Sequence, residues 1–160
     1  MRHKTFVITL LIVVVLLLAG GIFLSRFSLS AIEEPGHFET ELATKGKRFL
    51  VGRSARGLLP AAPAYTKASA GTGRMIYMGD CAACHGNDGR TPSEIGRSMY
   101  PRALDLSSAE VQEWSDAELF WIIQNGIRLS GMPGFGKLHQ SDEIWKLVHY
   151  VRSLRTPPAQ

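Results

Sequence analysis

The sequence is short of cysteine: its 160 residues include two, Cys81 and Cys84, separated by two alanines. No disulfide is therefore expected to help stabilise a small domain. A zinc site of the finger type needs two more ligands at finger-like spacing, and no further cysteine exists to supply them. A redox dithiol of the thioredoxin type belongs at the end of a strand in a βαβ pattern, whereas the flanks of this pair have a helical pattern.

Charge is missing from residues 6–24, where nineteen positions hold no charged side chain and Thr9 carries the only hydroxyl group. Such a segment is long enough to cross the hydrocarbon core of a bilayer as a helix. A secretory signal has a shorter apolar core of about 7 to 15 residues, followed by small residues at the cleavage site. We therefore expect residues 6–24 to be a transmembrane signal-anchor helix, with cleavage after Ser30 as the alternative.

The orientation of this helix follows from the distribution of lysine and arginine. Arg2 and Lys4 precede the apolar segment, and Arg26 is the only Lys or Arg in the eighteen residues that follow it. Positively charged flanks stay in the cytoplasm. We expect a single-pass protein of a bacterial cytoplasmic membrane, with residues 1–5 in the cytoplasm and the rest of the chain facing the periplasm or extracytoplasmic side.

The formal net charge of +4 is unevenly distributed along the chain. Residues 1–68 hold nine Lys and Arg against four Glu, a net of +5, whereas residues 69–160 hold nine against ten acids, a net of −1. The basic character belongs to the anchor and the segment after it, so nucleic acid is not an expected partner.

Residues 25–68 lack a sustained periodicity and contain Pro35, Pro60 and Pro63, so we expect a linker. Its four glutamates come first and are followed by a basic segment, residues 45–56, that has no acid. The linker is either a flexible, solvated spacer or a basic arm that lies on anionic lipid headgroups or docks on a membrane partner.

Residues 69–156 have helical patterns and lack the alternation typical of strands. Ser115 with Glu118 forms a capping box, Gly126 stops that helix, and Ser141 is the expected N-cap of the last helix. Four helices are expected, over residues 73–80, 108–112, 115–126 and 141–156, before a tail of residues 157–160. The predicted fold class is therefore all-α, a small helical domain preceded by a transmembrane helix and a linker.

Residues 81–85 read Cys-Ala-Ala-Cys-His, and C-x-x-C-H is the attachment signature of c-type haem. The thiols of Cys81 and Cys84 have the spacing to add across the two vinyl groups of one porphyrin. His85 is then held beneath the iron as the proximal ligand. The motif occurs once, so we expect one covalent haem c.

A sixth ligand is expected on the opposite face of the iron. We assign Met132, because it lies 47 residues beyond His85, after a helix that can cross the porphyrin, in a loop shaped by glycine and proline. Met75 and Met78 are too close to the cysteines to reach that face. Met99 follows the proximal histidine by only fourteen residues.

The imidazoles of His37, His139 and His149 are the other candidates for the sixth position. We expect His139 to be a loop residue and His149 to lie on the surface of a helix. A methionine opposite a histidine raises the reduction potential of the iron.

These motifs resemble those of the class I monohaem cytochromes c, in a membrane-anchored form. The resemblance covers residues 70–156 and rests on three blocks, Gly73-x-x-x-Tyr77-x-x-x-Cys81-x-x-Cys84-His85-Gly86, Gly131-Met132-Pro133-Gly134-Phe135 and Trp145-x-x-Val148-x-Tyr150-Val151-Arg152. It implies a small helical domain wrapped around its haem. We also expect Gly73 to let the first and last helices of the domain cross closely, with Tyr77 and Tyr150 beside them.

The resemblance also suggests residues around the haem. In the family a proline carbonyl accepts a hydrogen bond from the proximal imidazole, and Pro101 and Pro92 are both candidates for this role. Arg102 and Trp121 are candidate partners of the haem propionates, although a solvated charge and a core aromatic are equal alternatives.

The function implied by the resemblance is electron transfer by a tethered carrier, without catalysis of its own. The implied partners are a membrane and redox proteins, such as a quinol-oxidising complex or a reaction centre on one side and a terminal oxidase or reductase on the other. The alternatives are a fixed haem subunit of a respiratory or photosynthetic complex, and a haem peroxidase or other oxidoreductase in which Met132 leaves the iron.

Overall fold

The computed structural model describes residues 2–26, 30, 32–57 and 60–155, and the following description concerns these residues. They divide into two compact units, residues 1–33 and residues 34–160. Every regular element among the described residues is an α-helix, and none is a strand. The predicted all-α fold class is confirmed.

The first unit is formed by α1, which spans Arg2–Arg26. Within it, residues His3–Arg26 are long and apolar enough to cross a membrane, and an 18-residue window of this helix has a mean hydropathy of 3.1. Its large apolar side chains, from Phe6 to Leu24, are exposed. The helix has the length and composition expected of a membrane anchor.

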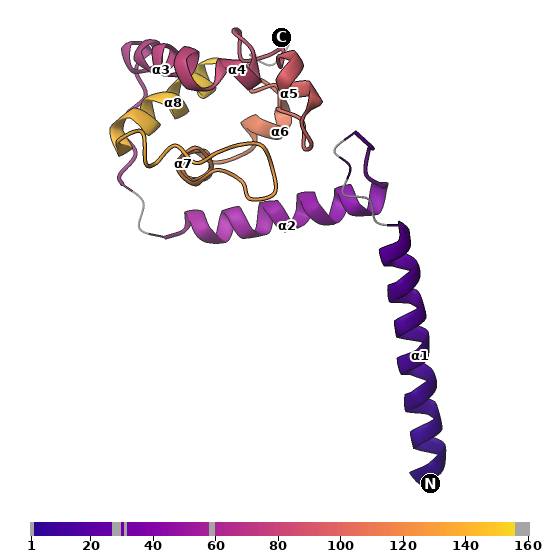
Figure 1. The fold of residues 1–160 in the computed structure, drawn as a ribbon. Coiled ribbons are helices and arrows are strands. Elements are labelled where there is room, and N and C mark those ends of the chain that lie inside the picture. Colours follow the sequence, from indigo (N-terminus) through magenta and orange to yellow (C-terminus); the bar gives the residue numbers. More distant parts are fainter. Residues whose placement is uncertain (1, 27–29, 31, 58–59, 156–160) are drawn as a thin grey trace, which may run out of the picture. The chain divides into compact units, whose positions relative to one another are not determined.

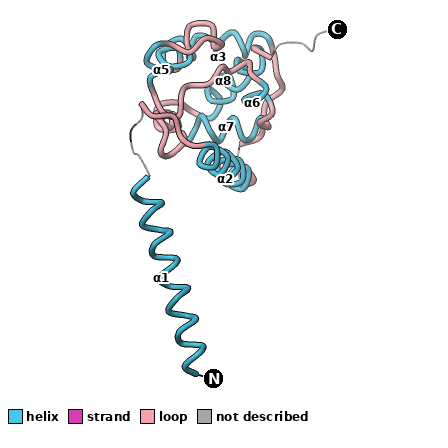
Figure 2. The backbone as a smooth tube through the Cα atoms, turned by 90° about the vertical axis from the view of Figure 1, so that its right-hand side faces the viewer, coloured by secondary structure: helices cyan, strands magenta, loops and turns pink. Residues whose placement is uncertain are grey.

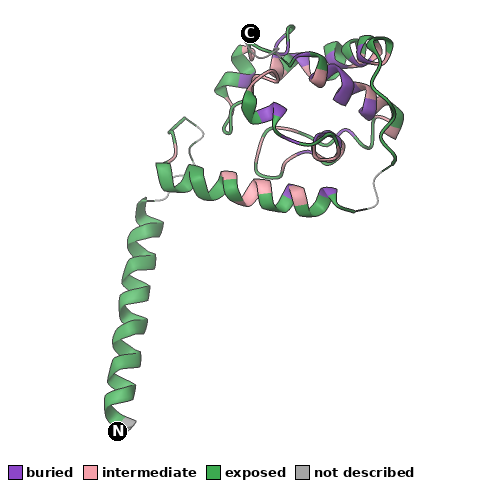
Figure 3. Cartoon of the chain, turned by 180° about the vertical axis from the view of Figure 1, so that it is seen from behind, coloured by how far each residue is buried: buried purple, intermediate pink, exposed green. Residues whose placement is uncertain are grey.

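The second unit is a group of helices that pack around a common apolar core (Figure 1). The described helices are α2 (His37–Ala55), α3 (Lys67–Asp80), α4 (Ala82–His85), α5 (Glu94–Ser98), α6 (Ala109–Gln112), α7 (Asp116–Asn125) and α8 (Ser141–Ser153). The largest fully buried side chains are Tyr77, Phe120, Ile144, Leu147 and Val148. Figure 3 shows the buried residues gathered on the inward faces of these helices.

The crossing of α3 and α8 is the main helix contact of this unit, as expected from the sequence. A Cβ atom at Gly73 would lie 1.9 Å from the carbonyl oxygen of Lys146, so only glycine allows the two backbones to approach so closely. The rings of Tyr77 and Tyr150 lie beside the crossing with their centroids 4.8 Å apart. This contact joins the helix that leads into the cysteines to the last helix of the unit.

The predicted helix ends are mostly confirmed. Ser115 and Glu118 form the expected capping box of α7, and Gly126 follows its last residue with a φ of 69°. The predicted N-cap of α8 is wrong by one residue, because Gln140, and not Ser141, caps this helix. The Glu143 carboxylate accepts a hydrogen bond from the backbone N–H of Gln140 at 3.0 Å.

Residues 25–68, expected to be a flexible or docking linker, contain a helix, α2, over residues 37–55. This helix packs against α7, and the two lie side by side in both views (Figure 1 and Figure 2). Val51 and Ala55 are buried in the contact. The far end of the predicted linker also differs, because α3 begins at Lys67 with Thr66 as its N-cap.

Candidate haem site

The two cysteines and the histidine lie on one helical turn. Cys81 is both the C-cap of α3 and the N-cap of α4, and its carbonyl accepts a hydrogen bond from the backbone N–H of His85 at 2.9 Å. Residues three and four apart on a helix lie on the same face, so this turn presents Cys81, Cys84 and His85 close together. Both thiols are free and half-buried.

The thiol of Cys81 is held in its protonated form. Burial raises the pKa of Cys81 to about 12, and the nearby Asp80 and Cys84 act in the same direction. A reactive dithiol of the thioredoxin type needs the opposite, a pKa lowered by positive charge or a helix N-terminus. The environment of Cys81 therefore disfavours a redox dithiol.

The imidazole of His85 is oriented by the backbone. Its Nδ1 atom lies 3.0 Å from the carbonyl oxygen of Leu104, and because a carbonyl can only accept, Nδ1 carries the proton. Burial lowers the pKa of His85, against the opposing effect of this hydrogen bond, so the ring is neutral at neutral pH. The lone pair is then on Nε2, for which the described residues provide no hydrogen-bond partner.

The predicted role of Pro101 or Pro92 as acceptor of this hydrogen bond is wrong, because the carbonyl of Leu104 takes it. Pro101 is exposed, and the carbonyl of Pro92 accepts from the guanidinium of Arg97 at 2.6 Å. Hydrogen bonds on either side fix the Leu104 segment. The N–H of Ala103 donates to Gly96 at 2.9 Å, and that of Leu106 donates to Gly89 at 2.8 Å.

Met132 lies in the loop that connects α7 to α8, as predicted, and packs half-buried against the apolar core. Two hydrogen bonds lie within the loop. The N–H of Met132 donates to Ser130 Oγ at 3.2 Å, and the N–H of Ile127 donates to the Met132 carbonyl at 3.3 Å. The loop also returns to α7, because Phe135 N–H donates to the carbonyl of Ile123 at 3.0 Å. The position of Met132 is therefore set by backbone contacts.

The other methionines differ in their surroundings. Met75 and Met78 are exposed on α3, in keeping with their rejection as ligands. Met99 is half-buried and lies against Gly131, where a Cβ atom would be 2.4 Å from the Met99 Cε atom. No pattern in the sequence indicates that Met99 lies next to the Met132 loop.

The histidine predictions are partly wrong. His139 is in a loop, as expected, and its ring nitrogens lie 2.9 Å from Asp80 Oδ2 and 3.4 Å from Glu143 Oε2. His149 is not a surface residue but is 5% exposed, and its Nδ1 lies 2.7 Å from the hydroxyl of Ser69. His149 therefore helps to join α8 to the start of α3.

The predicted propionate partners have other contacts in the structure. Arg102 is exposed and forms an ion pair with Glu34 at 2.6 Å. Trp121 is half-buried on α7 and packs against the core that also contacts Met132. Contact of Arg102 and Trp121 with a propionate stays a prediction.

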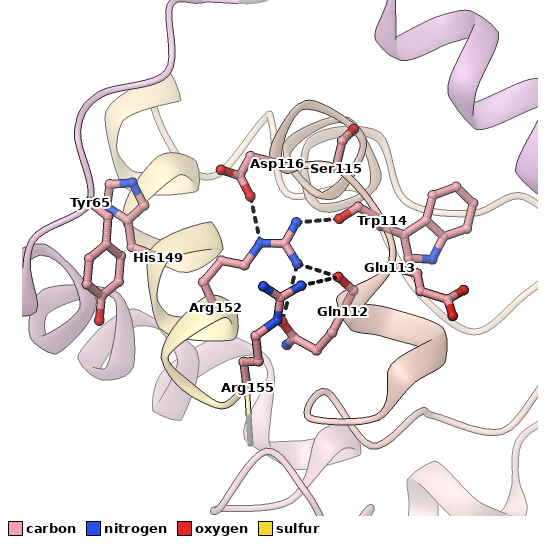
Figure 4. A pocket seen from close by; sticks show the side chains of 9 residues that line it. All are labelled: Tyr65, Gln112, Glu113, Trp114, Ser115, Asp116, His149, Arg152 and Arg155. Carbon is pink, nitrogen blue, oxygen red and sulfur yellow. Dashed lines mark hydrogen bonds and ion pairs between the residues drawn. The ribbon is translucent and has the colours of Figure 1, made fainter. Parts of the chain in front are cut away.

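Arg152 holds the end of α8 to the segment between α6 and α7 (Figure 4). Its guanidinium donates to Asp116 Oδ1 at 2.6 Å, to the Gln112 carbonyl at 3.0 Å and to the carbonyl of Trp114. Arg155 also donates to the Gln112 carbonyl, at 3.2 Å. Both guanidinium groups beside the surface pocket are thus already engaged in hydrogen bonds within the protein, and we assign these two arginines a structural role.

The residues present fit a covalent haem. Cys81, Met132 and Trp121 pack against the same core cluster, and Leu104, whose carbonyl orients His85, packs there too. Two free thiols, an imidazole with its Nε2 lone pair available and a thioether are the donor set that haem c requires. Trp145 Nε1 is buried in the same core without a hydrogen-bond partner among the described residues, so the core also offers a free donor.

A family comparison agrees with this chemistry. The family described as Cytochrome C oxidase, cbb3-type, subunit III matches residues 68–151, just over half of the chain. The chain belongs to this cytochrome c family. Electron transfer is therefore the activity of the cytochrome c domain, and haem c is its cofactor.

Two solved structures are similar to the cytochrome c domain. A chain of the Kuenenia stuttgartiensis reducing HAO-like protein complex Kustc0457/Kustc0458 is 25% identical, with a TM-score of 0.55, over 60% of this chain and 48% of that one. The KustC0563 c-type cytochrome is 29% identical, with a TM-score of 0.47, over 52% of this chain and 98% of that one. The match thus spans about half the length of the first relative. No curated protein matches.

Proposed function

We propose that this cytochrome c is a membrane-tethered carrier that holds one haem c and passes single electrons between redox partners on the outer face of a bacterial cytoplasmic membrane. The observation that carries the proposal is the hydrogen bond from His85 Nδ1 to the Leu104 carbonyl, at 3.0 Å. It fixes the tautomer that leaves Nε2 as a ligand, on the same turn as two free thiols.

Each residue of the site has a distinct role in this proposal. Cys81 and Cys84 would hold the haem through thioether bonds, and His85 and Met132 would coordinate its iron. The bound haem would supply the one-electron couple between Fe(II) and Fe(III). The hydrogen bonds within the loop around Met132 would keep its thioether in place as a ligand.

Two alternatives to a free carrier differ in what they need from the protein. A peroxidase or other oxidoreductase needs Met132 to leave the iron, and the backbone hydrogen bonds of its loop favour retention. A fixed subunit of a larger complex is supported by the similar chain in the Kuenenia stuttgartiensis complex. Co-purification after mild detergent extraction distinguishes a fixed subunit from a carrier.

Membrane attachment rests on α1, whose residues His3–Arg26 have the length and hydropathy of a span. The lysine and arginine bias supports an orientation with the cytochrome c domain on the periplasmic side. Fractionation tests this part of the proposal. A mature protein that begins near Ala31 and is found in the soluble periplasmic fraction would show that the segment is a cleaved signal.

The haem assignment is tested on the purified holoprotein. Haem mass should stay on the polypeptide after acid-acetone extraction, because thioether bonds are covalent. Met132→Ala should abolish the sulfur-to-iron charge-transfer band of the oxidised protein and lower its reduction potential. Met99→Ala is the matched control and should keep the band, although Met99 lies next to the same loop. Loss of the band in Met99→Ala alone, or rapid binding of carbon monoxide by the wild-type reduced protein, would contradict the assignment.

A further inference from the structure

The outward face of α2 carries large apolar side chains that the rest of the described unit does not cover. Phe38, Leu42, Phe49 and Leu50 are 74%, 62%, 64% and 59% exposed. Phe38, Leu42 and Phe49 follow one another at spacings of four and seven residues, so they form one stripe along the helix, which we call the outer stripe. Leu50 is exposed beside it, about 100° further round the helix. An apolar stripe of this kind on one helix indicates that something covers it.

The opposite face of α2 is the one that packs on the cytochrome c domain. Val51 and Ala55 are buried there. The two cations of this face are paired with acids of the domain: Lys47 lies 3.5 Å from Glu110, and Arg48 lies 3.1 Å from Glu113. The inward face of α2 therefore contacts the cytochrome c domain, and the outer stripe lies on a different face of the helix.

Three cations lie in line with the outer stripe. Lys45 falls between Leu42 and Phe49, Arg53 follows Phe49 by one helical turn, and Arg56 is the C-cap of the helix. Lys45 is paired with Glu41 at 3.0 Å, and no acid of the described residues is paired with Arg53 or Arg56. Lys and Arg side chains can lay their apolar stems along such a surface while their charged ends reach anionic headgroups, so this face suits the interface of an anionic bilayer.

The chain length between the two units keeps α2 near the proposed membrane. Ten residues separate the end of α1 at Arg26 from the start of α2 at His37. The eleven residue steps from Arg26 to His37 reach at most about 40 Å when fully extended. If α1 spans the bilayer, the first turn of α2 cannot leave the neighbourhood of the headgroups by more than that distance.

We propose that α2 is an interfacial helix, whose outer stripe inserts into the headgroup region of an anionic bilayer while its inward face carries the cytochrome c domain. The inference rests on the membrane anchor of the proposed function. In this arrangement the cytochrome c domain does not swing freely on a linker but keeps one side turned toward the membrane. Electron partners would then be reached by lateral diffusion along the bilayer.

The test uses the full-length holoprotein in vesicles. Because haem attachment consumes Cys81 and Cys84, the only cysteines of the chain, an introduced cysteine is the only free thiol for a spin label. Labels are placed by Leu42→Cys and Phe49→Cys on the outer stripe, and by Ile95→Cys as control. Ile95 is an apolar residue of α5 that is 61% exposed, close to the 62% of Leu42.

The readout is the collision rate of each label with oxygen, which partitions into lipid, and with a water-soluble nickel chelate. In vesicles of phosphatidylcholine and anionic phosphatidylglycerol, the oxygen-to-nickel ratio should be several-fold higher at positions 42 and 49 than at position 95. In phosphatidylcholine alone the difference should shrink, since the cations lose their partner.

Other outcomes would overturn the proposal. Equal ratios at the three positions in both vesicles would mean that the outer stripe is in water. Shielding from both quenchers, in detergent as well as in vesicles, would mean that a second copy of the chain covers the stripe. Equal insertion in both vesicles would contradict the assignment to anionic lipid. The haem spectrum and flotation with the vesicles report separately on the proposed electron carrier and its anchor.

Discussion

Gly73 on α3 lies so close to α8 that a Cβ atom there would be 1.9 Å from the carbonyl oxygen of Lys146. The obstructing atoms belong to the α8 backbone and cannot rotate away. Gly73→Ala should therefore separate the two helices and lower the free energy of unfolding by about 3 kcal/mol, at the upper end of overpacking costs. Denaturant unfolding followed by circular dichroism at the helix band measures this change.

Gly71 provides the control for this substitution, because it lies on the same helix and has nothing within 4 Å of its ideal Cβ position. Gly71→Ala should be neutral or stabilise the protein by up to about 1 kcal/mol, since alanine is the better helix former. If both variants changed stability alike, the close crossing would not be the reason that position 73 is glycine.

The loop around Met132 offers a second pair of glycines. A Cβ atom at Gly134 would be 2.6 Å from the backbone oxygen of Asn125, whereas one at Gly131 would meet only the flexible end of the Met99 side chain, at 2.4 Å. Gly134→Ala should displace the loop from α7, weaken the sulfur-to-iron band and lower the potential. Gly131→Ala should leave both nearly unchanged, because the Met99 side chain can move.

Optical spectroscopy and potentiometry of the two holoproteins measure these effects. The opposite order, with the larger loss in Gly131→Ala, would show that Met99 and not the loop backbone holds Met132 in place. Unchanged spectra in both variants would argue against a thioether ligand from this loop.

Local signals in the sequence were sufficient for the elements that position the haem motif. The capping box of Ser115 and Glu118, the stop at Gly126 and the close approach at Gly73 each depend on a short pattern with one physical cause. These features were predicted and are present. The predicted N-cap of α8 differs by one residue because Gln140, whose N–H donates to Glu143, takes a position that serine more often occupies.

Other features depend on contacts between distant segments and could not be predicted. The Leu104 carbonyl is brought to His85 by backbone hydrogen bonds of its neighbours to Gly96 and Gly89, which leave no side-chain pattern. The buried position of His149 depends on Ser69, eighty residues earlier in the chain.

The helix α2 was missed for a related reason. Its inward face uses Val51 and Ala55 with ion pairs, and its larger apolar residues point outward. The apolar pattern therefore gave no sign of packing against the domain.

Tyr77 gives a prediction about alkaline pH. Its side chain is 1% exposed and its hydroxyl donates to the carbonyl of Gly86, and burial, with Tyr150 adding to it, raises its pKa well above the ordinary value. Since the folded pKa is raised, the stability due to the protonated phenol is fully present below the unfolded pKa of about 10 and is lost as pH rises through the folded pKa.

Tyr77→Phe removes this dependence. At pH 7 the variant should be less stable than the wild type by about 1 to 2 kcal/mol, because the Gly86 carbonyl loses its buried donor. Above about pH 10 the difference in stability between the two proteins should shrink. Ionisation of Tyr77 in the unfolded state lowers the stability of the wild type there and cannot occur in the variant. Denaturant midpoints of both proteins between neutral and alkaline pH measure it, and a deficit that stays constant would contradict the raised pKa.

The packing of α2 on the cytochrome c domain predicts different effects at two adjacent positions. Val51 is 3% exposed and part of the main core cluster, whereas Leu50 is 59% exposed. Val51→Ala removes two buried methyl groups and should lower the free energy of unfolding by about 2 kcal/mol. Leu50→Ala should change it by less than about 0.5 kcal/mol in detergent, where no bilayer is present. Thermal and denaturant unfolding of the two holoproteins compare these values. Equal and small effects would mean that α2 is not held by the domain and behaves as the flexible linker that the sequence suggested.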